Sequence, residues 1–464
     1  MLSILNLALL GIALVIIGTP AQGATYYIAK TGNDANACTQ TQPCLTITRG
    51  SKVATKAGDI VQVGPGTYSE SLTLTTSGTS AGKITFRGHD GTGCPVVSNP
   101  DINSRGVRPA PTVTMNGFTV SASWIKIDCF NTNGNGVLDI TAANIHDVDV
   151  VNNYSAAGAG GAVGVYINDT LTLATSAQNI YVGYNFISGG GYGVLQKCRN
   201  CRFEYNEFFQ MNPGTSGADG DYARIFGYDI TFYRNYMHGN DRNLCGGSDC
   251  HIDCFQTFAY TADYPAYNIT LDSNVCFHAS EGIMASNEAK LAGFHDWTVR
   301  NNLFAHAPLN YYGAQCMIIS DIPNVAVYNN TCADSGVVTY AKTTTGYHRN
   351  NIHYNVGTYL AYRAIDGANV TADHNLLYDP SFKFSSSGDI VNVNPLFVNA
   401  SADNYQLQSG SPAKDAGAQV SLTSDILGGT RPVGAGYDIG AYEYGSLTSA
   451  QPTQPATNLS ATVN

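Results

Sequence analysis

The chain has 464 residues, of which 44% are hydrophobic, and it carries 34 acidic against 23 basic side chains, for a net charge of −11. This composition excludes an intrinsically disordered chain, which needs low hydrophobicity, and disfavours nucleic-acid binding, which needs clustered Lys and Arg. Length alone suggests about three domains of about 150 residues, but a solenoid adds coils to one core and can remain a single domain.

The N-terminal segment contains a short apolar run that Pro20 interrupts. We interpret residues 1–23 as a signal peptide, because the run is short for a membrane span and the small residues Ala21 and Gly23 precede a cleavage site at Ala24. An uncleaved membrane anchor is the alternative. We therefore expect a secreted or extracellular protein, with the periplasm or cell surface as other locations, and no membrane span in the mature chain.

Twelve cysteines suit an exported chain, in which most of them would pair as disulfides. Cys38 and Cys44 delimit a short loop. The other close neighbours in sequence are Cys198, Cys201, Cys245, Cys250 and Cys254. Zinc binding is the alternative for these clusters, because Cys-x-x-Cys supplies half of a tetrahedral ligand set.

A repeat of alternating apolar residues followed by an asparagine runs through the middle of the chain. Its nine copies end at Asn153, Asn185, Asn206, Asn235, Asn274, Asn302, Asn330, Asn351 and Asn375. The base period of about 21 to 24 residues is typical of solenoids. Period-2 alternation predicts a short strand with one buried face, and the asparagine marks the following corner, where it tolerates left-handed backbone and can form a ladder with its copies.

The repeat lacks the leucine consensus and the helix-compatible segment of leucine-rich repeats, which have a similar length. We therefore predict an all-β fold, a single-stranded right-handed parallel β-helix.

Segments at both ends of the chain carry a family resemblance. They are residues 25–34 (TYYIAKTGND), 43–47 (PCLTI), 57–63 (AGDIVQV), 66–70 (GTYSE), 394–398 (NPLFV), 405–407 (YQL), 411–417 (SPAKDAG) and 438–443 (DIGAYE). They resemble secreted right-handed parallel β-helix proteins of the pectate-lyase-like superfamily, including polysaccharide lyases of the family nine type. The resemblance implies a polysaccharide partner, a lysine base on the helix face, and aspartates that bind a Ca²⁺ cofactor. With the repeats, it places the β-helix at 24–395 and its closing segment at 396–445, before a flexible Ser/Thr/Pro/Gln tail at 446–464.

A second register lies between the asparagine corners. The segments 192–196, 253–256 and 281–284 look equivalent, so Asp253 and Glu281 are expected at the same position on successive coils, with Asp221 before them. Coils stack about 4.8 Å apart, and carboxylates at that separation raise one pKa or recruit a cation.

The longest interval between corners, from Asn235 to Asn274, surrounds this position, and inserted loops of solenoids tend to lie on the binding face. Strand alternation predicts that His251, Asp253 and Phe255 point one way. The predicted catalytic residues are Asp253, Glu281, His251, Asp221 and Arg242; the predicted substrate-binding residues are Gln256, Tyr222, Lys197 and Lys290; the predicted metal ligands are Asp221, Asp249, Asp253 and Glu281. The alternative is that Asp253 caps a turn and His251 bonds a loop carbonyl.

We expect a carbohydrate-active protein and a polysaccharide lyase that cleaves an acidic, uronate-containing polysaccharide by β-elimination. The chain departs from the family pattern, because no lysine lies near Met284, and Lys197, Arg224, Arg242 and Lys290 are the substitutes. A glycoside hydrolase is the alternative, since two carboxyl groups about 5 to 5.5 Å apart suffice for retention, or about 6.5 to 9.5 Å apart for inversion. A non-catalytic glycan-binding or cell-surface structural β-helix is the second alternative. We expect a monomer that binds no nucleic acid.

Overall fold

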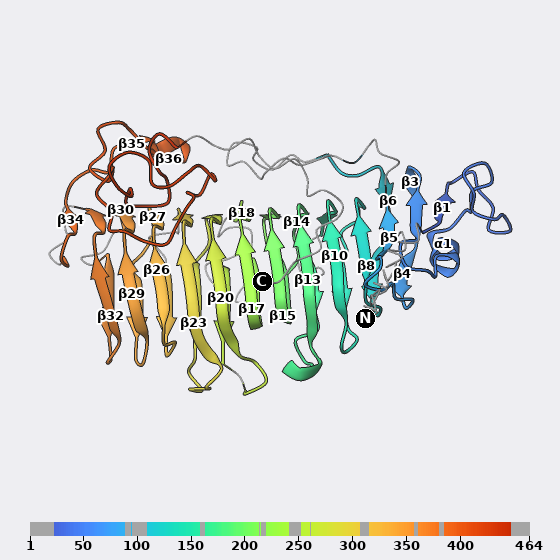
Figure 1. Cartoon of the computed structure of the whole chain (residues 1–464), viewed down its shortest axis with the longest axis horizontal. Helices are drawn as coiled ribbons and strands as arrows, with labels where there is room; N and C mark the ends of the chain where they lie inside the picture. The colour runs from blue at the N-terminus through green and yellow to red at the C-terminus, as the bar shows by residue number, and fades with distance from the viewer. Residues whose placement is uncertain are drawn as a thin grey trace, which may run out of the picture.

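The computed structural model of the chain describes residues 23–88, 94, 109–157, 163–212, 214, 220–240, 252–259, 261–306, 315–356, 361–379 and 385–446. It is an elongated stack of coils whose strands lie side by side along the long axis (Figure 1). Each coil passes through three parallel β-sheet faces in turn, and the coils wind in the right-handed sense that such parallel connections adopt. The predicted right-handed parallel β-helix is confirmed.

Faces 1 and 2 belong to one 22-stranded sheet, because the long strands β15 (Val194–Glu204) and β17 (Ala223–Tyr233) bend from one face to the other. Face 1 also contains β4 (Ser71–Leu74), β7 (Gly117–Val120), β9 (Leu138–Ile140), β12 (Val165–Ile167), β19 (Asp253–Phe258), β22 (Glu281–Ser286), β25 (Gln315–Ser320), β28 (Val338–Ala341) and β31 (Tyr362–Ile365). Face 2 also contains β1 (Thr25–Ile28), β2 (Ile60–Val63), β5 (Ile84–Arg87), β8 (Ile125–Asp128), β10 (His146–Val151), β13 (Ala177–Gly183), β20 (Ala266–Asp272), β23 (Phe294–Arg300), β26 (Val325–Tyr328), β29 (Thr345–Arg349) and β32 (Asn369–Asp373).

Face 3 is a 10-stranded sheet. It contains β11 (Tyr154–Ala156), β14 (Phe186–Ser188), β16 (Glu207–Phe209), β18 (Tyr236–His238), β21 (Val275–Phe277), β24 (Leu303–Ala305), β27 (Thr331–Ala333), β30 (Ile352–Tyr354), β33 (Leu376–Tyr378) and β34 (Ile390–Val391). The short strands β3 (Gly66–Thr67) and β6 (Val113–Thr114) pair with each other before it. Helix α1 (Ile47–Val53) packs against β1, β2 and β4 at the N-terminal end, and the 3₁₀ turn η1 (Leu173–Thr175) lies between β12 and β13.

The interior of the coils is apolar because every second residue of a strand points inward. On face 2, one inward column runs through Val150, Val182, Phe203, Phe232, Leu271, Val299 and Val327, all with 0% exposure. The ring centroids of Phe203 and Phe232 lie 4.5 Å apart, close to the spacing of the coils themselves. Identical register from coil to coil thus converts the sequence repeat into continuous buried columns.

All nine predicted corner asparagines form one buried ladder. In each step the side-chain Oδ1 accepts hydrogen bonds from the backbone N–H and the side-chain Nδ2–H of the asparagine one coil earlier, at 2.9 to 3.2 Å. At the C-terminal end, Asp389 Oδ1 replaces the amide and accepts the N–H of Asn375 at 2.8 Å. The ladder satisfies buried polar groups that the corners would otherwise leave without partners.

The left-handed backbone lies one residue before each ladder asparagine, which corrects the prediction that the asparagine itself adopts it. The residues with positive φ include Asn152, Tyr184, Tyr205, Arg234, Ser273, Asn301, Asn329, Asn350 and His374, with φ between 53° and 60°. The bend therefore occupies two residues: the first reverses the chain direction, and the second supplies the buried amide.

Disulfides confirm most of the expected cysteine pairing and remove the zinc alternative for Cys198 and Cys201, which are bonded to each other. Within the described residues the pairs are Cys38–Cys44, Cys94–Cys129, Cys198–Cys201, Cys254–Cys276 and Cys316–Cys332. The last two join face 1 to face 3 across the interior of one coil, because each links a strand start on face 1 to β21 or β27. Cys245 and Cys250 lie outside the described residues, as do residues 1–22 of the predicted signal peptide and residues 447–464 of the predicted tail.

The C-terminal segment, residues 396–446, folds back over the outer side of face 3 (Figure 1). It contains the antiparallel hairpin of β35 (Phe397–Asn399) and β36 (Asn404–Leu407), with the 3₁₀ turn η3 (Ala400–Ala402) between them. A second hydrophobic core forms there between the sheet and the segment. Its members include Leu303, Ile352, Leu376, Phe397, Tyr405 and Ile439. The segment therefore closes one face instead of adding further coils to the solenoid.

Three corner residues also hold this segment in place. Asn301 Nδ2 donates to the Ser424 carbonyl at 2.9 Å, and Asn329 Nδ2 donates to the Asp438 carbonyl at the same distance. Asn350 makes two hydrogen bonds, one in each direction, to the backbone of residue 418. Polar groups that point away from the ladder are thus satisfied by the returning chain.

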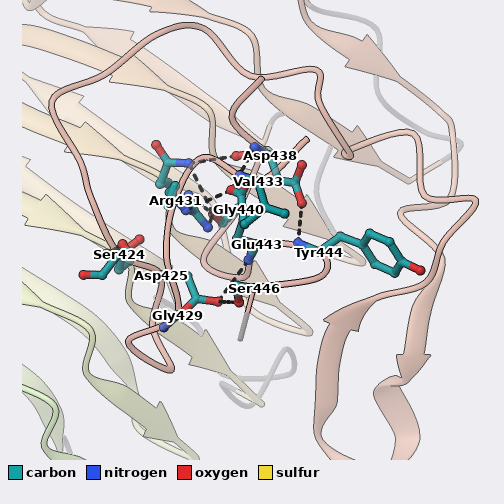
Figure 2. Close-up of polar contacts among 12 residues, drawn as sticks. Ser424, Asp425, Gly429, Arg431, Val433, Asp438, Gly440, Glu443, Tyr444 and Ser446 are labelled. Carbon is teal, nitrogen blue, oxygen red and sulfur yellow. Dashed lines mark hydrogen bonds and ion pairs between the residues drawn. The ribbon is translucent and has the colours of Figure 1, made fainter. Parts of the chain in front are cut away.

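A buried charge network organises the end of this segment, as Figure 2 shows. Arg431 forms an ion pair with Glu443, from Nε to Oε2 at 3.1 Å, and both side chains have 0% exposure. The guanidinium also donates to the Gly440 carbonyl at 3.0 and 3.1 Å, and Glu443 Oε1 accepts the N–H of Val433 at 2.7 Å. Because each charged group has several partners, the network can replace regular secondary structure in this segment.

Candidate functional site

A column of acidic and amide side chains lies where the chain enters face 1. Asp253 and Glu281 are direct partners on β19 and β22, and Glu281 is in turn the partner of Gln315 on β25. The pairing of Ala223 with Phe255 places Asp221 level with Asp253, and the N–H of Asp253 donates to Asp221 Oδ1 at 3.3 Å. The predicted register of the three carboxylates is therefore correct. We call Asp221, Asp253, Glu281 and Gln315 the acidic column.

The acidic column faces the outer side of the sheet, which corrects the expected alternation at the start of β19. Phe255 belongs to the interior core, where its ring contacts Phe232, and Cys254 also points inward, to its disulfide with Cys276. Asp253 instead accepts a hydrogen bond from Gln256 Nε2 at 3.1 Å. Two successive inward residues mark a bend at the start of the strand. The period-2 pattern predicted that Asp253 and Phe255 point the same way, but the bend turns them in different directions.

Arg224 is the central cation of face 1. It lies on the outer side, between the inward residues Ala223 and Ile225, and donates from Nε and Nη2 to Asp221 Oδ2 at 2.9 and 2.7 Å. Its guanidinium carbon lies 4.6 Å from the ring centre of Tyr192 and 5.0 Å from that of Phe258. Only 8% of the residue is exposed. An ion pair and two aromatic rings therefore hold this guanidinium in one orientation.

Lys197 lies on the neighbouring coil, two residues beyond Leu195, which is the strand partner of Arg224. Its Nζ donates to the Leu171 carbonyl at 2.7 Å and lies 3.6 Å from the ring centre of Tyr264. The residue is fully buried, and burial lowers the pKa of its ammonium group, although Asp169 and Asp263 oppose this shift. Lys197 is thus a lysine whose neutral form is favoured more than usual, beside the central cation of face 1.

The remaining predicted residues divide into four groups. Gln256 lies in the site, on β19 one coil after Arg224, with its amide bonded to Asp253. Tyr222 does not lie on the surface: its side chain is in the interior core with 0% exposure and donates to the His238 carbonyl at 2.7 Å, so its predicted role in substrate binding is wrong. Lys290 is exposed in the turn after β22. His251, Arg242 and Asp249 lie outside the described residues.

The described residues of face 1 do not fit a calcium ion. Ca²⁺ takes six to eight oxygen ligands, but Asp221 already receives Arg224 on Oδ2 and a backbone N–H on Oδ1. Across the described ranges, no group of three or more His, Cys, Asp or Glu side chains is placed to hold a metal. Of the predicted metal ligands Asp221, Asp249, Asp253 and Glu281, Asp221 is thus paired with Arg224 and Asp249 lies outside the described residues, so Arg224 takes the position where a cation was expected.

Sequence reasoning missed two parts of this arrangement. Gln315 extends the acidic column by one coil, but a shorter turn separates it from its corner asparagine, so the spacing used for Asp253 and Glu281 did not reveal it. The enclosure of Arg224 by Tyr192 and Phe258 depends on outer residues from three coils. Alternation along β17 and β19 places Phe258 on the same side as Arg224, but Tyr192 precedes β15 and no alternation along that strand places it.

Part of the chain matches a family of known sequences, and its fold resembles several solved structures. Residues 30–212 match the family described as protein of unknown function DUF1565. No curated protein matches the chain. Within the described ranges, the structure contains no helix that is long and apolar enough to cross a membrane.

The similar structures include lyases and a hydrolase. The chain is 13% identical to the pectate lyase Pel9A, with 91% of this chain and 98% of that chain covered and a TM-score of 0.48. It is 12% identical to a PL6 family polysaccharide lyase from Pseudopedobacter saltans, with 85% and 98% covered and a TM-score of 0.44. It is 13% identical to the GH136 lacto-N-biosidase from Eubacterium ramulus, with 76% and 68% covered and a TM-score of 0.39.

Proposed function

We propose that the protein is a polysaccharide lyase that cleaves an acidic, uronate-containing polysaccharide by β-elimination on face 1. The observation that carries this proposal is the immobilised Arg224 guanidinium beside a lysine with a lowered pKa. A guanidinium in a sheltered position binds carboxylates well, because it is planar, always charged and weakly hydrated. Elimination needs such a charge opposite the uronate carboxylate while a base removes the adjacent proton.

The proposed step uses residues of this chain alone. Arg224 binds the uronate carboxylate and stabilises the negative charge that develops there when the C5–H bond breaks. Neutral Lys197 takes the C5 proton on Nζ. The electron pair forms the C4=C5 double bond, the C4–O bond breaks, and the leaving oxygen takes a proton from water. Lowering the pKa of a lysine increases the fraction that can act as a base near neutral pH.

Access to the base depends on Tyr264. Its ring covers Lys197 Nζ at 3.6 Å, so the sugar must displace the ring before the proton can transfer. Asp253 and Glu281 lie on the adjacent coils with 0% and 5% exposure, so their carboxylates can accept hydrogen bonds from sugar hydroxyls only where the polymer displaces the groups that cover them. In this arrangement Arg224 and Lys197 act on the reacting sugar unit, and the acidic column positions the adjoining sugar units.

The test is the ultraviolet absorbance of the unsaturated uronate formed from a panel of pectate, alginate and glycosaminoglycans. Wild-type protein should give a rise with at least one polymer, and Lys197→Met and Arg224→Met should remove it. Arg363→Met is the matched control, because Arg363 occupies the same outer column several coils away and should leave the rise intact. No rise with any polymer would contradict elimination.

Hydrolysis by paired carboxyl groups is the second candidate, and the direct pairing of Asp253 with Glu281 favours it. Adjacent coils lie about 4.8 Å apart, which approaches the carboxyl separation of about 5 to 5.5 Å in retaining glycoside hydrolases. Release of reducing ends without an absorbance rise, lost in both Asp253→Asn and Glu281→Gln, would establish this mechanism in place of elimination.

A further inference from the structure

An aromatic platform lies on the outer side of face 2, away from the acidic column. Tyr181 and Gly183 point outward from β13, because the intervening residues Ile180 and Val182 are buried in the core. A Cβ atom on Gly183 would lie 2.6 Å from Tyr181 Oη, 2.7 Å from Cζ and 2.9 Å from Cε1. The phenol ring therefore lies flat along its own strand, over the place where a side chain at 183 would stand.

This orientation leaves the opposite face of the ring turned away from the sheet. Tyr181 remains partly exposed. Burial of its hydroxyl end, followed by the charge of Glu204, raises the pKa of Tyr181, so the hydroxyl stays protonated and can donate a hydrogen bond. A flat, rigid ring with a polar rim suits the apolar face of a pyranose, because ring C–H groups pack on the aromatic face while hydroxyl groups bond at its edge.

Charged groups flank the ring on the next coil. Arg202 is the strand partner of Tyr181, and Glu204 is the partner of Gly183. Arg202 Nε donates to Glu204 Oε1 at 2.8 Å, while its side chain remains 61% exposed. Thr231 follows on the third coil at the same outer position. Tyr181, Arg202 and Thr231 thus form a column at the spacing of the coils, which is about 4.8 Å, and Glu204 lies beside Arg202 on the same strand.

We propose that this surface is a second carbohydrate-binding site, which stacks a pyranose unit on Tyr181 and bonds the oxygens of the adjoining unit through Arg202. It performs no chemistry and holds a polysaccharide chain along the solenoid axis. The choice of a uronate-containing polysaccharide as ligand rests on the proposed function, since Arg202 would pair with its carboxylate. The platform itself rests on Tyr181 and Gly183, which take no part in elimination.

The test is native electrophoresis in gels that contain pectate, alginate or a glycosaminoglycan at graded concentrations, from which a dissociation constant follows. Tyr181→Ala should weaken binding by at least ~10-fold, which corresponds to about 1.4 kcal/mol. Tyr181→Phe should keep most of it, because the ring face remains. Gly183→Ala should weaken binding with Tyr181 still present, because the new Cβ lifts the ring. Tyr347→Ala is the matched control, at the same outer position several coils away.

A face 1 variant separates this proposal from the proposed function. Arg224→Met should abolish the absorbance rise and leave the electrophoretic retardation that depends on Tyr181. Equal binding by wild type, Tyr181→Ala and Gly183→Ala would overturn the second site, as would retardation of wild type by none of the polymers. Retardation that disappears only in Arg224→Met would also overturn it and assign all binding to face 1. Circular dichroism of each variant confirms that the β-helix is folded.

Discussion

The imidazole rings of His348 and His353 meet inside the solenoid, with their Nε2 atoms 2.9 Å apart. His348 Nδ1 also lies 2.8 Å from the hydroxyl oxygen of Tyr340. Both histidines are fully buried, and burial lowers the pKa of His348 well below its usual range and that of His353 to about 3. The hydrogen bond between the two Nε2 atoms needs one protonated and one bare nitrogen, and burial favours the neutral form of both rings.

We expect the pair to make the protein less stable in mild acid. Below about pH 6.5 the unfolded histidines bind protons, whereas His353 does so in the folded state only near pH 3. The free energy of unfolding should therefore fall as pH drops from about 6.5 to 5, by up to about 1.4 kcal/mol per pH unit for each histidine. Urea unfolding at several pH values measures this slope. His353→Leu should reduce this slope, and an unchanged slope in the variant would contradict the role assigned to the pair.

The asparagine ladder should be a major source of stability in the middle coils. Asn274→Ala removes the amide that bonds Asn235 and Asn302, and leaves buried donors and acceptors without partners. The expected loss is about 2 to 3 kcal/mol in the free energy of unfolding. Asn268→Ala is the matched control, because its amide bonds Asp229 at an exposed position of β20 in the same coil. Equal effects of the two substitutions on the urea midpoint would contradict the role assigned to the ladder.

The free energy of unfolding should fall further when one partner of the Arg431–Glu443 pair is replaced than when both are replaced. Glu443→Gln leaves a buried guanidinium without its counter-charge, which should cost about 3 to 5 kcal/mol. The double variant Arg431→Met/Glu443→Leu should recover part of that loss, because the ion pair is removed as a unit, although Asp425 and Asp438 remain buried beside it. A double variant less stable than both single variants in thermal unfolding would show that the hydrogen bonds to Gly440 and Val433 matter more than the charges.

Substitutions in the acidic column distinguish a positioning role from proton transfer. If elimination depends on Lys197 and Arg224, then Glu281→Gln should raise KM for the polymer and change kcat by less than about 10-fold. A general acid, in contrast, contributes about 10² to 10⁴ in rate. Steady-state kinetics on the best polymer of the panel measures both parameters. A fall in kcat of about 10²- to 10⁴-fold would assign Glu281 a catalytic role.

A metal chelator should leave the activity unchanged. Arg224 is ion-paired with Asp221 at the position where the family resemblance expected calcium, so the uronate carboxylate meets a guanidinium there. EDTA added to wild-type protein in the absorbance assay should not alter the initial rate. A loss that returns on addition of Ca²⁺ would show that residues outside the described ranges, such as Asp249, complete a metal site.

The sequence predicts the coil framework well because its determinants are local and repeated. Each asparagine stands at the end of an alternating segment, so the ladder and the level pairing of Asp253 with Glu281 follow from spacing. The direction of Asp253 could not be predicted from alternation, because the bend at Cys254 interrupts period 2 and brings two residues inward. The enclosure of Arg224 requires the lateral placement of three coils, which no single segment contains.

The course of the C-terminal segment was also beyond the reach of local patterns. Its contacts join residues far apart in sequence, such as Asn301 with Ser424 across 123 positions and Asn350 with Ala418 across 68. Motif resemblance marked residues 396–445 as a closing segment, but the fold-back over face 3 depends on apolar residues of several strands that become neighbours only after the coils stack. Alternation within one strand does not state what will cover its outer side.

Because the C-terminal segment covers face 3, the strands of that face are made before the residues that bury their outer side. Leu303, Ile352 and Leu376 are synthesised before the residues near Ile439 that cover them, so the apolar outer side of face 3 is uncovered until those residues follow. Until the residues near Ile439 are synthesised, each incomplete chain exposes this apolar surface, to which other copies or chaperones can bind. The covering of face 3 by residues 396–446 thus distinguishes a chain synthesised through this segment from one interrupted before it.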